Sequence, residues 1–368
     1  MKAFAVSDYK GPLSEAEIAE PAVGDRDVLV QVAAAGVNHL DEKVRSGEFK
    51  QILPYQLPIT LGHDLAGTVI ETGTKVHGFK VGDQVYGRPR DGRIGTFAER
   101  ISVDASDLAP RPATLSAVEA ASLPLVALTA WQTLVDRGGV RAGQKVLIHA
   151  GAGAVGTIAI QLAKHLGATV ATTTSAANAD FARTLGADIV IDYRSHDFEQ
   201  ELSDYDLVLD SLGGDNLRKS LGVLRPGGKA IGISGPPDPA FAKEAGLNPV
   251  IRVAIAALSA TTRRRAKKLG VDYEFHLMHA SGDQLRQITT LVDSGVIHPT
   301  VGKTFTFDQT PMALEALATG AVRGKPVIIL PAHVVRSTRP RRRSPTIMNK
   351  TRLPPRRPKE RMPSQADR

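Results

Sequence analysis

Three glycines, Gly151, Gly153 and Gly156, have the spacing of a loop that binds the diphosphate of a dinucleotide. The first permits a tight turn, the second lets the backbone approach the diphosphate, and the third lets a helix pack closely on a strand. The residues between the glycines complete the turn and open the helix: Ala152, Ala154 and Val155. Free N–H groups and the helix dipole favour an anion at such a helix start. The sequence therefore predicts a dinucleotide site at 151–156.

The residues around these glycines predict a strand, a helix and a second strand. Lys145–Ala150 is a short apolar run, Val155–Leu166 has helical apolar periodicity, and Thr169–Thr174 is rich in β-branched residues. This order is the one that the dinucleotide fingerprint requires. The alternative is a glycine-rich turn in an ordinary α/β domain.

The end of the second predicted strand indicates which nucleotide is bound. An NAD site places Asp or Glu about 20 residues past the glycines to hold the ribose 2′-hydroxyl, whereas Thr172–Ser175 contains no carboxylate. Two like charges ~4 Å apart repel by about 4 kcal/mol at an effective dielectric near 20, so the missing acid favours a 2′-phosphate. Ser175 can donate a hydrogen bond to that phosphate. Arg194, beside Tyr193, is the candidate cation, with a solvated surface charge as the alternative. We therefore expect NADP(H).

Length and composition exclude several classes of protein. A chain of 368 residues predicts about two domains. The absence of cysteine excludes disulfides, thiolate zinc sites and a thiol nucleophile, and it suits a reducing compartment. The N-terminus has no secretory signal pattern, and no apolar run reaches the ~18 residues of a membrane span. We therefore expect a cytoplasmic protein.

The net charge of +8 is concentrated at the C-terminal end. Residues 331–368 hold twelve Lys and Arg against two acids, so the preceding 330 residues carry a net charge of −2. The same residues, 331–368, contain seven prolines and little apolar periodicity, which predicts a disordered basic tail over 332–368. Nucleic-acid binding is not expected of the globular part. For the tail, phosphate contacts and an incidental extension are the two alternatives.

The pattern of elements changes near residue 122. Before it, short strands such as Val28–Ala34 and Gly67–Glu71 alternate with glycine-rich turns. After it, strands and helices alternate, which predicts an α/β fold with a parallel, doubly wound sheet and its ligand at the carboxyl ends of the strands. The chain closes with a predicted strand at Lys303–Phe307, a helix at Pro311–Thr319 and a strand at Pro326–Leu330.

One segment, 236–270, resists interpretation. Its basic run at 263–268 is most simply a solvated helix end or a loop.

Several motifs together resemble the medium-chain dehydrogenase/reductase superfamily over essentially all of 1–330. They lie at 34–41, 61–67, 82–87, 127–131, 151–156 and 324–327. The resemblance implies a GroES-like β-rich catalytic domain, built from 1–121 with 300–331, and a Rossmann NADP-binding domain over 122–299. It also implies a homodimer formed along an edge strand, for which Val271–Leu277 is the candidate.

The zinc alcohol dehydrogenases of this superfamily use a Cys, a His and a third ligand, typically Cys. Here these positions hold Asn38, His63 and Leu125. A zinc site from His63 with Asp41 and Asp64 is the alternative, but adjacent side chains do not easily converge on one metal. The chain therefore most resembles the zinc-independent quinone oxidoreductase branch, which implies hydride transfer to a small-molecule quinone or α,β-unsaturated carbonyl.

The resemblance also implies roles for individual residues. Asn38 would orient the acceptor oxygen through its amide. Asp41 belongs to the same motif, with a hydrogen bond to a local turn as its alternative role. Thr129 would approach the diphosphate or the nicotinamide, and Leu212 and Ile233 would line the nicotinamide half. No proton donor is assigned.

A second hypothesis comes from another class of protein. The chain would then be a non-catalytic NADPH-binding sensor, or a partner-binding protein that uses its basic tail. An amide retained at Asn38 in the expected cleft favours the enzyme.

Overall fold

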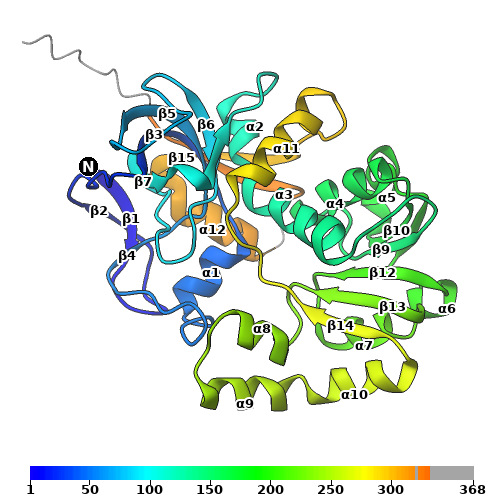
Figure 1. The fold of residues 1–368 in the computed structure, drawn as a ribbon. Helices are drawn as coiled ribbons and strands as arrows, with labels where there is room; N and C mark the ends of the chain where they lie inside the picture. The colour runs from blue at the N-terminus through cyan, green and yellow to red at the C-terminus, as the bar shows by residue number, and fades with distance from the viewer. Residues whose placement is uncertain (320–321, 332–368) are drawn as a thin grey trace, which may run out of the picture. The chain divides into compact units, whose positions relative to one another are not determined.

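A computed structural model describes residues 1–319 and 322–331. Six parallel strands form one sheet in the order β11-β10-β9-β12-β13-β14 (Figure 1). Their bounds are β9 (Lys145–Ile148), β10 (Thr169–Thr174), β11 (Ile189–Asp192), β12 (Tyr205–Asp210), β13 (Leu224–Gly232) and β14 (Asp272–Phe275). This is the order of a doubly wound nucleotide-binding sheet, which confirms the predicted fold class. The tail predicted for 332–368 lies outside the described residues.

Helices connect these strands and cover the sheet. They are α3 (Pro124–Trp131), which continues as a π-helical segment at Gln132–Arg137, α4 (Ala154–His165), α5 (Ala179–Thr184), α6 (Phe198–Glu201), α7 (Gly214–Ser220) and α11 (Gly282–Asp293). The strand that precedes the glycines ends at Ile148, two residues earlier than predicted. Ala150 already has a positive φ of 54°, so the turn begins there.

The segment that resisted interpretation forms three helices. They are α8 (Pro239–Glu244), α9 (Pro249–Leu258) and α10 (Ala260–Leu269). The basic run 263–268 lies inside α10 and reaches its last turn, which agrees with a solvated helix end and not with a loop. Lys, Arg and Ala are strong helix formers, and Gly270 ends the helix in the left-handed conformation.

A second sheet has the order β15-β16-β3-β5-β6-β8, with β7 also paired to β3. Its strands are β3 (Asp27–Gly36), β5 (Asp64–Thr72), β6 (Gln84–Gly87), β7 (Arg100–Asp104), β8 (Leu108–Pro110), β15 (Val301–Thr306) and β16 (Lys325–Ile329). The C-terminal strand β16 runs antiparallel to β3, with Val327 opposite Gly36. The end of the chain thereby joins the sheet that its beginning forms. The residues at which the two predicted domains divide stay a prediction.

The remaining elements flank this second sheet. A small sheet has the order β2-β1-β4, formed by β1 (Lys2–Val6), β2 (Ser14–Glu17) and β4 (Ile59–Thr60). Three further α-helices are α1 (His39–Ser46), α2 (Ala117–Ala121) and α12 (Thr310–Ala318), and short 3-10 helices occur at Ala105–Asp107, Ala176–Asn178 and Phe307–Gln309. Among the described residues, no helix has the length and apolar character needed to cross a membrane.

Candidate functional site

One cavity of about 1030 Å³ lies at the carboxyl ends of the six parallel strands. Each of the six strands contributes a residue to the cavity lining, either its last residue or one that follows within two positions. In chain order these are Ala150, Thr174, Tyr193, Ser211, Ile233 and His276. Ligands of doubly wound sheets bind at this edge. The structure therefore has a large cavity where the sequence predicts the nucleotide.

The glycine-rich turn forms one wall of this cavity. Helix α4 begins at Ala154, and its N-cap, Gly153, offers no side chain to the first N–H groups, which have no intrahelical acceptor. A Cβ at Gly156 would lie 2.3 Å from the carbonyl oxygen of Ala150, so only glycine fits there. The turn therefore suits the diphosphate of a dinucleotide.

The predicted cofactor residues divide by their place relative to the cavity. Those that line it are Thr129, Ala152, Gly153, Ala154, Val155, Gly156, Ser175, Tyr193, Leu212 and Ile233. Gly151 and Arg194 do not. Gly151 packs against β10, where a Cβ would lie 2.2 Å from Oγ1 of Thr172, so its role is to keep the turn tight.

The basic group near the end of β10 differs from the one the sequence suggested. The guanidinium of Arg194 lies 5.8 Å from the ring centroid of Tyr193, outside the cavity lining. Arg323 lines the cavity instead, with its guanidinium 5.1 Å from the ring centroid of Phe181. Phe181 follows closely after Ser175 in the chain, so this arginine lies toward the end of β10. Local sequence could not indicate Arg323, because it reaches the cavity only through the C-terminal return of the chain.

The other end of the cavity holds a buried group of three polar side chains. The ammonium of Lys325 lies 2.7 Å from Oδ2 of Asp64 and donates a hydrogen bond to Oδ1 of Asn38. Nδ2 of Asn38 donates to the same Asp64 oxygen at 2.9 Å. The second Asp64 oxygen accepts from the backbone N–H of Leu125 at 2.8 Å. Asn38 and Lys325 line the cavity, and Lys325 is only 2% exposed.

Sequence reasoning missed Lys325. The motif at 324–327, which contains this lysine, contributed only to the family resemblance, and no chemical role was expected of the lysine. The structure gives both polar atoms of Asn38 protein partners: Nδ2 donates to Asp64 and, at 3.4 Å, to the carbonyl oxygen of Gly36, and Oδ1 accepts from Lys325. The role of Asn38 in orienting an acceptor oxygen stays a prediction.

Asp41 lies beneath this group and not on the cavity wall. One of its oxygens accepts from the backbone N–H of Asn38 at 2.7 Å, and the other lies 2.5 Å from Nδ1 of His63. Both side chains are fully buried. This placement favours the alternative of a local hydrogen-bonding role for Asp41.

The residues at the zinc-ligand positions do not fit a zinc ion. Leu125 has no donor atom, the amide of Asn38 is tied to Asp64 and Lys325, and the Lys325 ammonium already pairs with Asp64. No group of three or more His, Cys, Asp or Glu that could hold a metal occurs among the described residues. The polar groups that this end of the cavity offers are an amide, a carboxylate and an ammonium.

Two histidines on the cavity wall have lowered pKa values. Desolvation within the cavity, followed by the charges of Lys325 and Lys43, lowers the pKa of His39. Burial, with Arg137 and His279 nearby, lowers the pKa of His276 to about 4. His276 pairs with Oε1 of Gln132 at 3.0 Å through Nε2, which satisfies the neutral ring.

This shift predicts an acid-sensitive fold. Because an unfolded histidine titrates near 6.5, the neutral His276 contributes stability above that pH and loses it as the pH falls toward 4. Its full contribution is about 3 kcal/mol of unfolding free energy. We expect His276→Gln to flatten the decline in this pH window, measured by urea unfolding. The exposed His196→Gln is the control, and an unchanged slope in His276→Gln would contradict the assignment.

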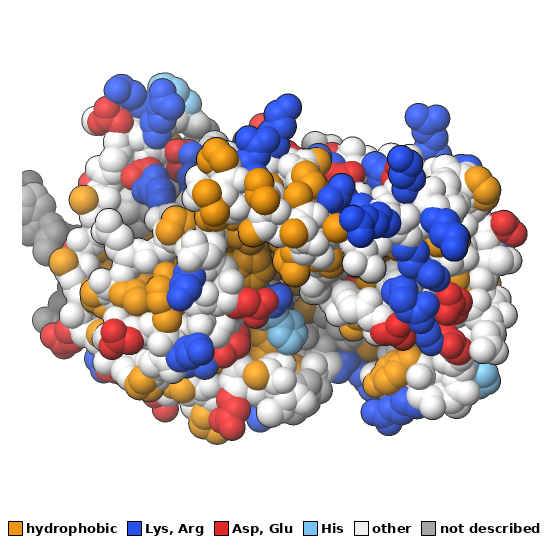
Figure 2. Space-filling view, turned by 90° about the horizontal axis from the view of Figure 1, so that it is seen from below, with side chains coloured by type: hydrophobic (Ala, Val, Ile, Leu, Met, Phe, Trp, Pro, Cys, Tyr) orange, Lys and Arg blue, Asp and Glu red, His pale blue; other side chains and the backbone are white. Residues whose placement is uncertain are grey.

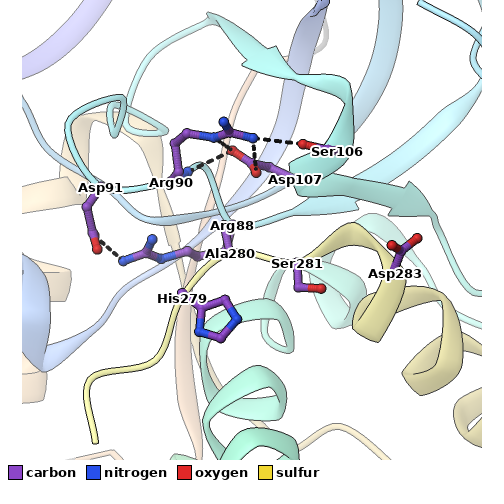
Figure 3. Close-up of a pocket in the computed structure, with 9 residues that line it drawn as sticks. All are labelled: Arg88, Arg90, Asp91, Ser106, Asp107, His279, Ala280, Ser281 and Asp283. Carbon is purple, nitrogen blue, oxygen red and sulfur yellow. Dashed lines mark hydrogen bonds and ion pairs between the residues drawn. The ribbon is translucent and has the colours of Figure 1, made fainter. Parts of the chain in front are cut away.

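A second cavity of about 440 Å³ lies between the loop at 88–91 and the start of α11 (Figure 3). Each of its charged side chains forms an ion pair with another side chain, although Nε and Nη1 of Arg88 have no hydrogen-bond partner among the described residues. Arg88 binds Asp91 at 2.5 Å and Arg90 binds Asp107 at 2.8 Å, while Asp283 binds Arg286 outside the lining. Arg88 is fully buried, so solvent does not reach its guanidinium. We therefore assign no ligand to this cavity.

Comparison with known proteins agrees with the geometry. A family model described as an alcohol dehydrogenase GroES-like domain matches residues 24–113, and one described as a zinc-binding dehydrogenase matches 185–328. The NAD(P)H oxidoreductase RTN4IP1, mitochondrial, of Danio rerio is 33% identical over an alignment of 326 residues, which covers 82% of this chain and 83% of that protein.

A plant relative and a solved structure extend the comparison. The chloroplastic NADPH-dependent alkenal/one oxidoreductase of Arabidopsis thaliana is 33% identical over 341 residues, covering 89% of this chain and 79% of that protein. The structure of the quinone oxidoreductase from Coxiella burnetii has a TM-score of 0.77 and 31% identity, covering 90% of this chain and 99% of that one. The chain therefore belongs to the medium-chain dehydrogenase/reductase superfamily, within the group that includes the quinone oxidoreductases.

Proposed function

We propose that this protein transfers a hydride from NADPH to a quinone or an α,β-unsaturated carbonyl without a zinc ion. The observation that carries the proposal is one cavity that joins the turn at 153–156 to the buried ammonium of Lys325. The plant relative is named for alkenal and enone reduction with NADPH, and the structural relative for quinone reduction. Both names fit a cavity with a nucleotide cradle at one end and a cation at the other.

We propose that Arg323 and Ser175 bind the 2′-phosphate, with Asn178 beside them. All three line the cavity near the end of β10, and the described residues that line this cavity include no Asp or Glu. Nδ2 of Asn178 donates to Oγ of Ser175 at 3.2 Å, which leaves the serine hydroxyl proton available for a phosphate oxygen.

Lys325 supplies the positive charge at the acceptor. A lysine ammonium has three N–H donors, and those of Lys325 that are paired go to Asp64 and Asn38. The remaining donor suits the acceptor's carbonyl oxygen, where negative charge develops during reduction. Asn38 and Asp64 then act as positioning residues that hold the ammonium at the cavity wall.

The rest of the acceptor end is largely apolar. Its lining includes Leu40, Phe49, Leu125, Leu277 and Met278. Such a wall favours a hydrophobic substrate that presents one polar oxygen. Quinones and conjugated carbonyls have this character.

The reaction balances without a metal. NADPH, when bound, supplies a hydride. Hydride addition to the conjugated carbon moves an electron pair onto the carbonyl oxygen, next to Lys325. With a quinone, this oxygen takes a proton from solvent, the attacked carbon then loses a proton to solvent and the second carbonyl oxygen gains one, which gives the aromatic hydroquinone. With an enone, the proton goes to the α-carbon of the enolate and yields a saturated carbonyl.

Turnover assays test this function. NADPH oxidation would be followed with 1,4-benzoquinone, a long-chain enal and a ring enone, with NADH in parallel. We expect turnover with at least one acceptor and a preference for NADPH. NADPH binding without any turnover would overturn the proposal and favour a non-catalytic sensor, and a preference for NADH would overturn the cofactor assignment.

The cofactor preference should depend on Arg323. Replacing Arg323 with alanine removes a charge-assisted hydrogen bond worth about 2 kcal/mol, so KM for NADPH should rise about 30-fold. KM for NADH should change little, because NADH has no 2′-phosphate. Arg194→Ala is the matched control and should leave both values near wild type. A larger loss in Arg194→Ala would reverse the assignment.

We also propose a homodimer in the cytoplasm. Strand β14 is the last strand of its sheet, and in the described part its outer edge is unpaired, so a second copy could extend the sheet there. Light scattering after gel filtration should give twice the chain mass, and a monomer would contradict the dimer. We propose that residues 1–331 do not bind nucleic acid, so that any such binding is confined to the basic tail, 332–368.

A further inference from the structure

Helix α9 presents its apolar side chains outward. Val250, Val253 and Leu258 are 79%, 70% and 64% exposed, while Ile255 is the buried residue of this helix. At 100° per residue, Val250, Val253 and Ala257 lie within 60° of one another on the side opposite Ile255, and the exposed Ala254 and Leu258 extend this stripe along one flank of the helix. A surface helix normally has the reverse arrangement.

The adjoining helix α10 places cations beside this stripe. Residues 245–271 contain six Lys and Arg and no Asp or Glu. Arg263 donates to the backbone oxygen of Ala256, and Arg265 donates to that of Arg218. The four exposed others have no ion pair with any described residue: Arg252, Arg264, Lys267 and Lys268. Figure 2 faces these helices and shows the hydrophobic side chains gathered over α9, with Lys and Arg gathered over α10.

We propose that α9 and α10 dock the protein on the surface of an anionic lipid bilayer. An outward apolar stripe flanked by Lys and Arg is the arrangement of helices that lie in the membrane interface. The cations would attract anionic headgroups, and Val250, Val253 and Leu258 would enter the acyl boundary.

The positive charge beside the stripe of α9 argues against a second copy of this chain as the partner that covers it. A two-fold contact through this stripe would bring the cations of one copy close to the same cations of the other. No carboxylate within 245–271 could neutralise them. A lipid surface instead supplies both the apolar phase and the negative charge.

The docking face is connected to the cavity by the chain itself. The segment that carries α8, α9 and α10 leaves from Ile233 and Ser234 and returns at His276, all of which line the cavity. If the proposed function holds, docking would bring the cavity close to a phase in which hydrophobic quinones dissolve. The docking itself does not depend on that function.

A single labelled cysteine tests the contact directly. The chain has no cysteine, so Val253→Cys creates one attachment site for an environment-sensitive dye in the full-length protein. Val81→Cys is the matched control, because Val81 is also exposed, by 64%, and lies just before β6 of the second sheet. Phosphatidylglycerol-containing vesicles should shift the emission of the label at 253 to the blue, and leave the label at 81 unchanged. NADPH binding by both labelled proteins would confirm that they are folded.

Charge variants test the cations. The triple change Arg264→Gln, Lys267→Gln and Lys268→Gln should weaken co-sedimentation with these vesicles at least about tenfold. A control triple of exposed cations elsewhere, Lys10→Gln, Arg26→Gln and Lys80→Gln, removes the same charge and should have a small effect.

Three results would overturn the proposal. One is vesicle binding without a shift at position 253, which would assign binding to the basic tail. Another is an equal loss of co-sedimentation with vesicles in the two triple variants. The third is a shift at 253 that depends on protein concentration without vesicles, which would assign the stripe to self-association. Loss of turnover with vesicle binding intact would contradict only the proposed function.

Discussion

Replacing Lys325 with methionine is expected to lower kcat with a quinone by at least about 100-fold, the usual loss when one donor to a developing oxyanion is removed. The side chain lies at the cavity wall between Asp64 and Asn38, where no other described cation contacts either group. The change also leaves the buried Asp64 carboxylate without its cation, so the free energy of unfolding should fall by about 3–5 kcal/mol. Stopped-flow turnover and urea unfolding would measure the two effects.

A second substitution separates catalysis from stability. Adding Asp64→Asn to Lys325→Met removes the uncompensated charge, so much of the lost stability should return. Turnover should stay low, because the donor to the acceptor oxygen is still missing. If the double variant regained wild-type kcat, Lys325 would be a structural residue only.

The glycine-rich turn should respond differently at two of its positions. At Gly156, a Cβ would lie 2.3 Å from the Ala150 carbonyl oxygen and 2.8 Å from the Gly151 Cα, both backbone atoms that cannot move aside cheaply. Gly156→Ala should therefore weaken NADPH binding at least about 100-fold and lower the free energy of unfolding by about 1–3 kcal/mol. Fluorescence titration with NADPH and urea unfolding would measure these effects.

Gly153→Ala is the matched comparison. Its φ of −78° and ψ of 164° suit any residue, and a Cβ there would lie 3.1 Å from the nearest atom, the Ala150 carbonyl oxygen. The free energy of unfolding should change by no more than about 0.5 kcal/mol. Because Gly153 lines the cavity, the added methyl group should still weaken NADPH binding. Wild-type NADPH affinity in Gly156→Ala would show that the nucleotide does not use this turn.

The nucleotide half of the fold was predictable because its signals are local. The strand, turn and helix around Gly151–Gly156 lie within about 30 residues, and their apolar periods are readable without tertiary contacts. The structure places β10 at Thr169–Thr174, the bounds that the sequence predicts. The three helices of 236–270 were not predictable in this way, because the outward stripe of α9 reverses the usual apolar pattern.

The acceptor half shows the limit of local reasoning. The sequence motif identifies Asn38, because this residue stands where the zinc alcohol dehydrogenases have a cysteine ligand. Its partner Lys325 is 287 residues away in the chain and reaches it only because β16 pairs with β3.

The sequence by itself therefore determined a doubly wound sheet, a glycine-rich turn followed by a strand whose end, Thr172–Ser175, has no carboxylate, and zinc-ligand positions of which only His63 keeps a donor. These properties depend on residue types at short spacings. Arg194 lies outside the cavity lining, and only the tertiary structure decided that Arg323 and Lys325 line it. Both arrive on the C-terminal return of the chain. The pairing of distant strands depends on burial and register across the whole sheet, which no local pattern encodes.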